Sequence, residues 1–106
     1  MSKRLAVLEK MVAAGTKDSF AWYGLALEYA GLGRFDEALG TFEKLKAMDA
    51  AYVPMYLMCG TMLIKNGKAG AGRAWLAAGI EAARAKGDNH ALSELESALS
   101  TAPPGD

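Results

Sequence analysis

The sequence repeats itself with a period of 34 residues. When the chain is shifted by that distance, large, small and turn-forming residues keep their positions. The aligned pairs are Trp22 with Tyr56, Leu25 with Cys59, Ala26 with Gly60, Tyr29 with Leu63, Gly33 with Gly67, Arg34 with Lys68, and Phe42 with Leu76. A period of this length, made of two helices, is typical of stacked helical hairpins. It restricts the fold strongly, because each hairpin must bury its apolar face against a neighbour.

Glycines divide the chain into six segments of helical length. The segments are residues 3–14, 19–31, 35–48, 54–66, 69–86 and 89–100. Within each segment the apolar residues recur at intervals of three and four, which is the period of an amphipathic helix. No segment alternates apolar and polar residues for long. The sequence therefore predicts an all-α fold of about six helices with no sheet.

Several residues mark the ends of these helices. Gly15 is suited to the position after a helix end. Asp18 or Ser19 can cap the second helix, and Pro54 fits the first turn of the fourth. The fifth helix contains three glycines, Gly70, Gly72 and Gly79. Each costs about 1 kcal/mol of helix propensity relative to alanine, so we expect close approach of another helix to offset this.

The first full repeat resembles the tetratricopeptide repeat family. The resemblance lies in the large and small residues Trp22, Leu25, Ala26, Tyr29, Gly33, Ala38, Leu39 and Phe42. The second repeat departs from the family pattern, with Cys59 in place of leucine, Gly72 in place of alanine and Ala50 in place of the closing proline. The resemblance implies an antiparallel helix-hairpin solenoid with a right-handed superhelical twist.

The same resemblance implies one domain over residues 1–106. It would consist of a leading half-repeat (3–14), repeats at 19–52 and 53–86, a closing helix (89–100) and a frayed tail (101–106). The first helix of each repeat would line a concave groove. The groove residues would be Phe20, Tyr23, Leu27, Ala30, Leu57, Thr61, Ile64 and Lys65. Some members of the family hold an acidic peptide terminus with lysine and asparagine side chains, and this surface has no such clamp.

The implied groove is apolar. If five large side chains were open at about 100 Å² each, the patch would be roughly 500 Å², near the upper limit of what monomers expose. We therefore expect it to be covered. A partner segment could cover it as a helix in a groove, and so could the last helix of the chain or a second copy.

Composition excludes several other classes of function. Twelve basic and twelve acidic residues give no net charge, whereas a nucleic-acid binder shows a basic excess or stripe. A single cysteine, Cys59, cannot form an internal disulfide, which favours a reducing compartment. Charges interrupt the apolar residues at the start of the chain, and no apolar stretch is long enough to span a bilayer. We expect a soluble cytoplasmic protein with no membrane partner.

No group of residues points to catalysis. His90, the only histidine, has no partners at metal-ligand or acid–base spacing and is interpreted as a capping or surface residue. Cys59 lies on an apolar stripe and is interpreted as buried. Asp36 and Glu37 point about 100° apart on a helix, so they cannot act as an acid–base pair. The glycine-rich segment 67–72 follows a helix and not a strand, so it does not fit a phosphate-binding loop. We expect no enzyme activity, no cofactor and no metal.

The leading hypothesis is an adaptor that binds a hydrophobic or amphipathic polypeptide segment in the groove. The alternative is a self-associating module, in which the groove or the face with Gly72 and Gly79 forms a homodimer. A small enzyme or ligand carrier would need convergent polar groups in the core, which the apolar stripes do not supply. Two interpretations of Trp75 remain: packing beneath the last helix, or an exposed anchor.

Overall fold

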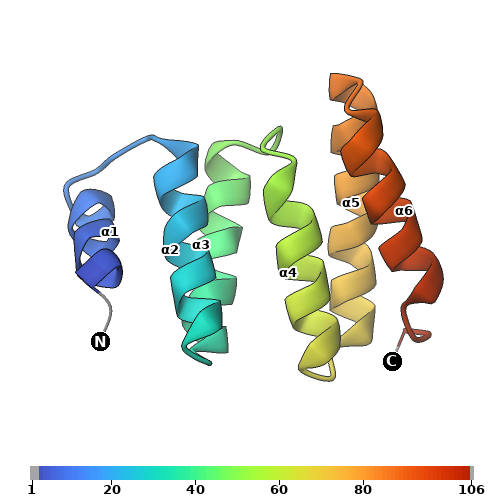
Figure 1. The fold of residues 1–106 in the computed structure, drawn as a ribbon, viewed down its shortest axis with the longest axis horizontal. Helices are drawn as coiled ribbons and strands as arrows, with labels where there is room; N and C mark the ends of the chain where they lie inside the picture. The colour runs from blue at the N-terminus through green and yellow to red at the C-terminus, as the bar shows by residue number, and fades with distance from the viewer. Residues whose placement is uncertain (1–2, 106) are drawn as a thin grey trace. The chain divides into compact units, whose positions relative to one another are not determined.

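The computed structural model describes residues 3–105, and every regular element among them is an α-helix (Figure 1). The helices are α1 (Lys3–Ala13), α2 (Ser19–Gly31), α3 (Phe35–Met48), α4 (Pro54–Lys65), α5 (Ala69–Lys86) and α6 (Asn89–Thr101). The predicted all-α class, with six helices and no sheet, is confirmed for these residues. Each boundary lies within one residue of its predicted position.

The same turn closes the α2–α3 and α4–α5 hairpins. Gly33 and Gly67 both have positive φ angles, 76° and 79°, a region that glycine occupies without steric cost. Arg34 N–H donates to Tyr29 O and Lys68 N–H donates to Leu63 O, each at 2.9 Å. These bonds satisfy carbonyl groups that would otherwise be unpaired at the helix ends. The 34-residue period of the sequence is thus reproduced in the backbone of the two turns.

Helix starts follow local side-chain chemistry. Of the two candidate caps, Asp18 is the one used, and its Oδ1 accepts a hydrogen bond from Phe20 N–H at 3.0 Å. Ser19 instead donates to Asp49 Oδ2 at 2.6 Å, which joins the start of α2 to the end of α3. Pro54 is the first residue of α4, where its missing N–H is not needed.

The described residues up to Ala50 form one compact unit, and those from Ala51 form a second. In the first unit, α2 packs against both α1 and α3. Ala26 of α2 and Ala38 of α3 are fully buried, so the two helices approach closely at small residues. The remaining core of this unit consists of Leu5, Leu8, Ala21, Leu25, Tyr29, Phe42 and Leu45.

In the second unit, α5 packs against α4 and α6. A Cβ built on Gly72 would lie 2.7 Å from Gly60 O and 2.6 Å from Ile64 Cγ1. A Cβ built on Gly79 would lie 2.5 Å from Tyr56 Cβ. Real Cβ atoms do not approach other atoms this closely, so only glycine fits at either position. The predicted close approach of another helix is therefore confirmed for Gly72 and Gly79.

The segment after α6 is held by α5. Arg73 Nη1 lies 3.4 Å from the carbonyl oxygens of Leu99, Ala102 and Pro103, and donates to all three. Thr101, predicted to begin a frayed tail, is the last residue of α6. The two residues that follow it, Ala102 and Pro103, contact the Arg73 cation of the neighbouring helix, and fraying of the tail remains a prediction. Asp106 lies outside the described residues.

The division after Ala50 falls two residues before the predicted start of the second repeat, at 53. Each unit thus contains one hairpin of the repeat, α2–α3 or α4–α5, together with one flanking helix. Solenoid stacking concerns the placement of one unit against the other, and it remains a prediction.

Candidate functional site

The predicted groove residues of the first unit share one face of α2. Phe20 is 63% exposed, and Tyr23, Leu27 and Ala30 are half-buried. Their spacing of three and four residues places them on one stripe of the helix. The opposite stripe of α2 includes Leu25 and the buried Tyr29. The first unit therefore presents an apolar helix face at the residues that the sequence indicated.

Helix α1 adds two exposed apolar side chains that are not among the predicted groove residues. Val7 is 57% exposed and Met11 is 38% exposed. They follow Arg4 along one stripe of α1, and Arg4 Nη2 would lie 3.6 Å from a Cβ on Gly24. Gly24 is in turn one helical turn from Phe20. Val7 and Met11 are thus exposed on a helix that packs against α2. We call the set Val7, Met11, Phe20, Tyr23 and Leu27 the α1–α2 apolar face.

The predicted groove residues of α4 do not form a comparable face. Ile64 is half-buried, and its Cγ1 packs against Gly72 of α5. Thr61 is also half-buried, and its hydroxyl donates to Leu57 O at 2.8 Å within the helix. Lys65 is exposed. Leu57 is half-buried and lines a hollow.

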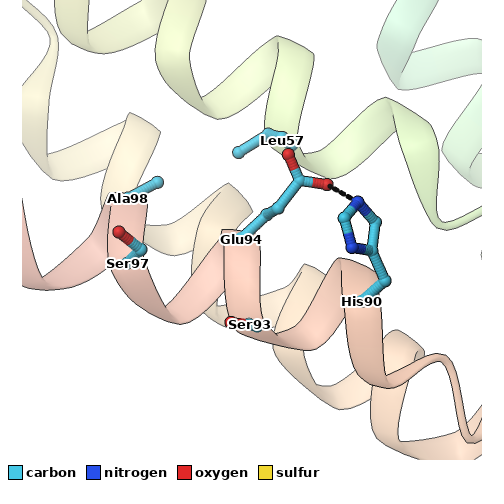
Figure 2. Close-up of a pocket in the computed structure, with 6 residues that line it drawn as sticks. All are labelled: Leu57, His90, Ser93, Glu94, Ser97 and Ala98. Carbon is cyan, nitrogen blue, oxygen red and sulfur yellow. Dashed lines mark ion pairs between the residues drawn. The ribbon is translucent and has the colours of Figure 1, made fainter.

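That hollow lies between α4 and α6 and has a volume of about 450 Å³. Its lining residues are Leu57, His90, Ser93, Glu94, Ser97 and Ala98. Figure 2 shows Leu57 on α4 beside the Glu94 carboxylate of α6. His90 Nε2 lies 3.1 Å from Glu94 Oε1, across one turn of α6. The last helix of the chain thus packs beside the predicted α4 surface and gives it a polar wall.

The sequence contained a signal for these α6 residues that was not used. His90, Glu94 and Ser97 are spaced four and three residues apart, on a stripe next to the one that contains the buried Leu95. The sequence predicted α6 as a closing helix that could also cover the groove. Its contact with Leu57 depends on how α6 packs against α4, which the period of the sequence does not specify.

A polar network surrounds Tyr29 in the first unit. Its hydroxyl donates to Glu9 Oε2 at 2.6 Å, and Arg34 lies over its ring, 4.8 Å from the centroid. The hydrogen bond to the Glu9 carboxylate, together with burial, raises the pKa of Tyr29 to about 12. Arg34 also binds Glu37 through two hydrogen bonds of 2.6 and 2.7 Å, and this guanidinium lowers the pKa of Glu37. The network joins α1, α2 and α3.

The residues considered for chemistry each have their own surroundings. Cys59 is fully buried in the core of the second unit, as its apolar stripe predicted. His90 is exposed and pairs with Glu94, so the surface interpretation holds and the cap of α6 is Asp88. Asp36 and Glu37 are both exposed in the first turn of α3. Among residues 3–105 there is no group of three or more His, Cys, Asp or Glu side chains that could hold a metal ion.

The glycine face considered for a homodimer is not exposed. Gly72 and Gly79 are buried between α5 and its neighbours within the second unit. They are not on a surface that a second copy could reach, so the proposed glycine interface is wrong.

Trp75 is half-buried, and its ring lies 5.9 Å from that of Tyr56.

None of the helices among residues 3–105 has the length and apolar character needed to cross a membrane.

No protein-family model matches the sequence, and no curated protein matches it. Among solved structures, the chain is similar to the solution structure of protein BPP2914 from Bordetella parapertussis. The TM-score is 0.79 with 28% sequence identity, and the similarity covers 94% of this chain and 87% of that one. The similarity supports the six-helix fold.

Proposed function

We propose that this chain is a tetratricopeptide-type adaptor that binds an amphipathic segment of another polypeptide. The observation that carries the proposal is the α1–α2 apolar face. Phe20 has most of its surface in solvent, although it is one of the largest apolar residues in the chain. Solvent-exposed aromatic residues within an apolar patch are the usual anchors of protein interfaces.

The chemistry of this face fits a helix laid along it. The apolar side chains lie on two adjacent helices, which is the arrangement that receives an amphipathic helix with anchors at every third or fourth residue. The ion pair between Arg4 and Glu28, at 3.3 Å, borders the apolar residues. Such a polar rim excludes water from the centre of an interface and adds little affinity of its own.

Two matched substitutions test the proposal. Phe20→Glu places a charge on the face, at a side chain that is 63% exposed and so makes few contacts within the chain. Phe35→Glu is the control, because Phe35 is 41% exposed and begins α3, at the other end of the hairpin. Each purified variant is immobilised, and proteins retained from an extract of the native cell are quantified by mass spectrometry. We expect a set of proteins that is reduced about tenfold by Phe20→Glu and retained by Phe35→Glu.

Circular dichroism must show the same helix content in both variants. Equal capture by wild type and Phe20→Glu would contradict the proposal, and so would the absence of any protein retained by the wild type. Light scattering over a dilution series addresses the homodimer alternative directly. A dimer that Phe20→Glu dissociates would identify a second copy as the occupant of this face.

A further inference from the structure

A second hollow lies on the opposite side of α2 from the α1–α2 apolar face. It has a volume of about 310 Å³. Its lining residues are Val12 of α1, Trp22, Leu25 and Tyr29 of α2, and Glu37, Gly40, Thr41 and Lys44 of α3. This volume is at the lower end of the range for ligand pockets, so it suits a single large side chain. All of the lining residues belong to the first unit.

The lining offers apolar surface although it contains polar residues. The Thr41 hydroxyl donates to Glu37 O at 2.7 Å, so the polar group of this side chain is already paired. The Trp22 indole N–H donates to Thr16 O at 2.9 Å, so the polar atom of that ring is already paired. Leu25 and Val12 are aliphatic. An apolar group that entered the hollow would therefore leave neither of these two polar atoms without a partner.

The second repeat shows what fills the equivalent position. Under the 34-residue shift, Trp22 corresponds to Tyr56 and Thr41 corresponds to Trp75. In the second unit the Tyr56 and Trp75 rings lie 5.9 Å apart with a tilt of 49°, a favourable geometry for an aromatic pair. The first repeat has threonine where the second has an indole. The first repeat therefore has a hollow beside Trp22, whereas the second repeat has an indole beside the equivalent Tyr56.

Gly40 independently indicates that this space is kept open. Packing explains the glycines at 60, 72 and 79, because a Cβ at any of these positions would meet a neighbour at 2.5–2.8 Å. A Cβ on Gly40 would meet nothing within 4 Å. The second repeat has Ala74 at the equivalent position. Glycine weakens a helix relative to alanine, and no contact within the described chain accounts for it at position 40.

The charges at the rim favour an acidic neighbour. Glu37 is engaged by Arg34 through two hydrogen bonds. Lys44 is exposed and makes no ion pair with the residues that the structure describes. The rim thus carries one cation that is not compensated. A carboxylate next to the entering side chain would lie close to that cation.

We propose that this hollow binds an indole-sized aromatic side chain of a partner polypeptide, with an acidic residue adjacent to it in the partner sequence. The guest ring takes the place against Trp22 that Trp75 takes against Tyr56. This site is separate from the α1–α2 apolar face and does not depend on the function proposed above.

A short peptide tests the site by NMR. The probe is the blocked pentapeptide Ser-Asp-Trp-Ala-Ser, titrated to about 5 mM, which is sufficient for a weak millimolar site. We expect saturable shifts of the Gly40 and Thr41 amides and of the Trp22 indole N–H, with none at the Trp75 indole. A peptide with alanine in place of tryptophan should cause no shifts. Replacing its aspartate with lysine should weaken binding about threefold or more, and Lys44→Glu should do the same to the original probe.

Two variants fill the hollow. Thr41→Trp copies the second repeat, and Gly40→Leu places a side chain in the open space beside it. Each should weaken peptide binding by about tenfold or more, and Gly40→Leu provides the test if Thr41→Trp does not fold. Phe20→Glu is the control and should bind the peptide as the wild type does, which separates this site from the α1–α2 apolar face.

Three results would overturn the proposal. The first is that the resonances of the hollow do not move at the highest peptide concentration. The second is that both filled variants, folded by their NMR spectra, bind as well as the wild type. The third is that the shifts occur along Phe20, Tyr23 and Leu27 and disappear with Phe20→Glu, which would assign the peptide to the other face.

Discussion

Gly79 of α5 lies so close to Tyr56 of α4 that a Cβ at position 79 would be 2.5 Å from Tyr56 Cβ. The same atom would be 2.9 Å from Leu95 Cδ2 of α6. This one position therefore sets the spacing of three helices in the second unit. The contact lies at the backbone end of the Tyr56 side chain, so a change of rotamer cannot relieve it.

We accordingly expect Gly79→Ala to destabilise the protein by about 1–3 kcal/mol, the usual cost of overpacking a core. Gly40→Ala is the matched control, because its Cβ would meet no neighbour. That substitution should stabilise by about 0.5–1 kcal/mol through helix propensity and the lower entropy of the unfolded chain. Urea denaturation followed by circular dichroism measures both. Equal effects at the two positions would show that α4, α5 and α6 do not pack as described.

The hydrogen bond from Tyr29 to Glu9 predicts an unusual phenol titration. Because the pKa of Tyr29 is raised to about 12 from its ordinary value of 10, one tyrosine should form phenolate near pH 12 in the ultraviolet spectrum. Tyr29→Phe should lower the absorbance change near pH 12 by the amount of one phenolate. Glu9→Gln should lower its pKa toward 10, since the amide lacks the negative charge. An absorbance change near pH 12 that is the same in wild type and Tyr29→Phe would contradict the assignment.

The same shift has a consequence for stability. The folded state holds the Tyr29 proton more tightly than the unfolded state does. The contribution of the protonated Tyr29 to the free energy of unfolding is therefore fully present below pH 10. It decreases as the pH rises from 10 through about 12, because the unfolded chain loses the proton first. The difference in free energy of unfolding between wild type and Tyr29→Phe should therefore narrow over that range. A difference that is constant from pH 9 to 12 would exclude this linkage.

Burial of Cys59 predicts that its thiol is protected in the folded protein. The side chain is fully buried in the core of the second unit. A thiol reagent such as Ellman's reagent should react slowly with the native protein and rapidly in urea. Met58→Cys in a Cys59→Ala background is the positive control, because Met58 is exposed on the same helix. Rapid labelling of native Cys59 would show that α4 opens readily.

Arg73 should keep the segment after α6 ordered. Its guanidinium donates to three carbonyl oxygens at 3.4 Å, which are long bonds, so we expect a loss of at most about 1 kcal/mol in Arg73→Ala. The effect should be local. Amide heteronuclear NOE values for residues 101, 102 and 105 should fall, whereas those of α2 and α3 remain unchanged. No change at these residues would mean that α6 is held by its apolar contacts alone.

The positions of the helices could be predicted from the sequence because their causes are local. Apolar spacing, Asp18, Pro54 and the glycines at 33 and 67 act within a few residues of the boundaries that they set. The 34-residue period also identified which residues are equivalent in the two hairpins. The face of α2 that bears Phe20, Tyr23 and Leu27 follows from the same helical phase, since the opposite stripe is needed for the core.

The surfaces of the second unit could not be predicted in this way. Leu57, Thr61 and Ile64 have the same phase on α4 as Tyr23, Leu27 and Ala30 have on α2. Their surroundings differ because α6 packs beside Leu57 and because Ile64 contacts the glycine at position 72 of α5. Such contacts depend on residues that are distant in sequence.

The sequence by itself determined six helices, two equivalent hairpins and the residues that face inward, because these properties depend on short-range spacing. Only the tertiary structure decided which glycines admit a neighbouring helix and which leave a space open. Gly79 and Gly40 are both glycines within helices, and their different roles arise from what other helices place beside them. The same reason separates Thr41 from Trp75: their positions in the repeat are equivalent, and the volumes of their side chains leave a hollow in one unit and a packed ring pair in the other.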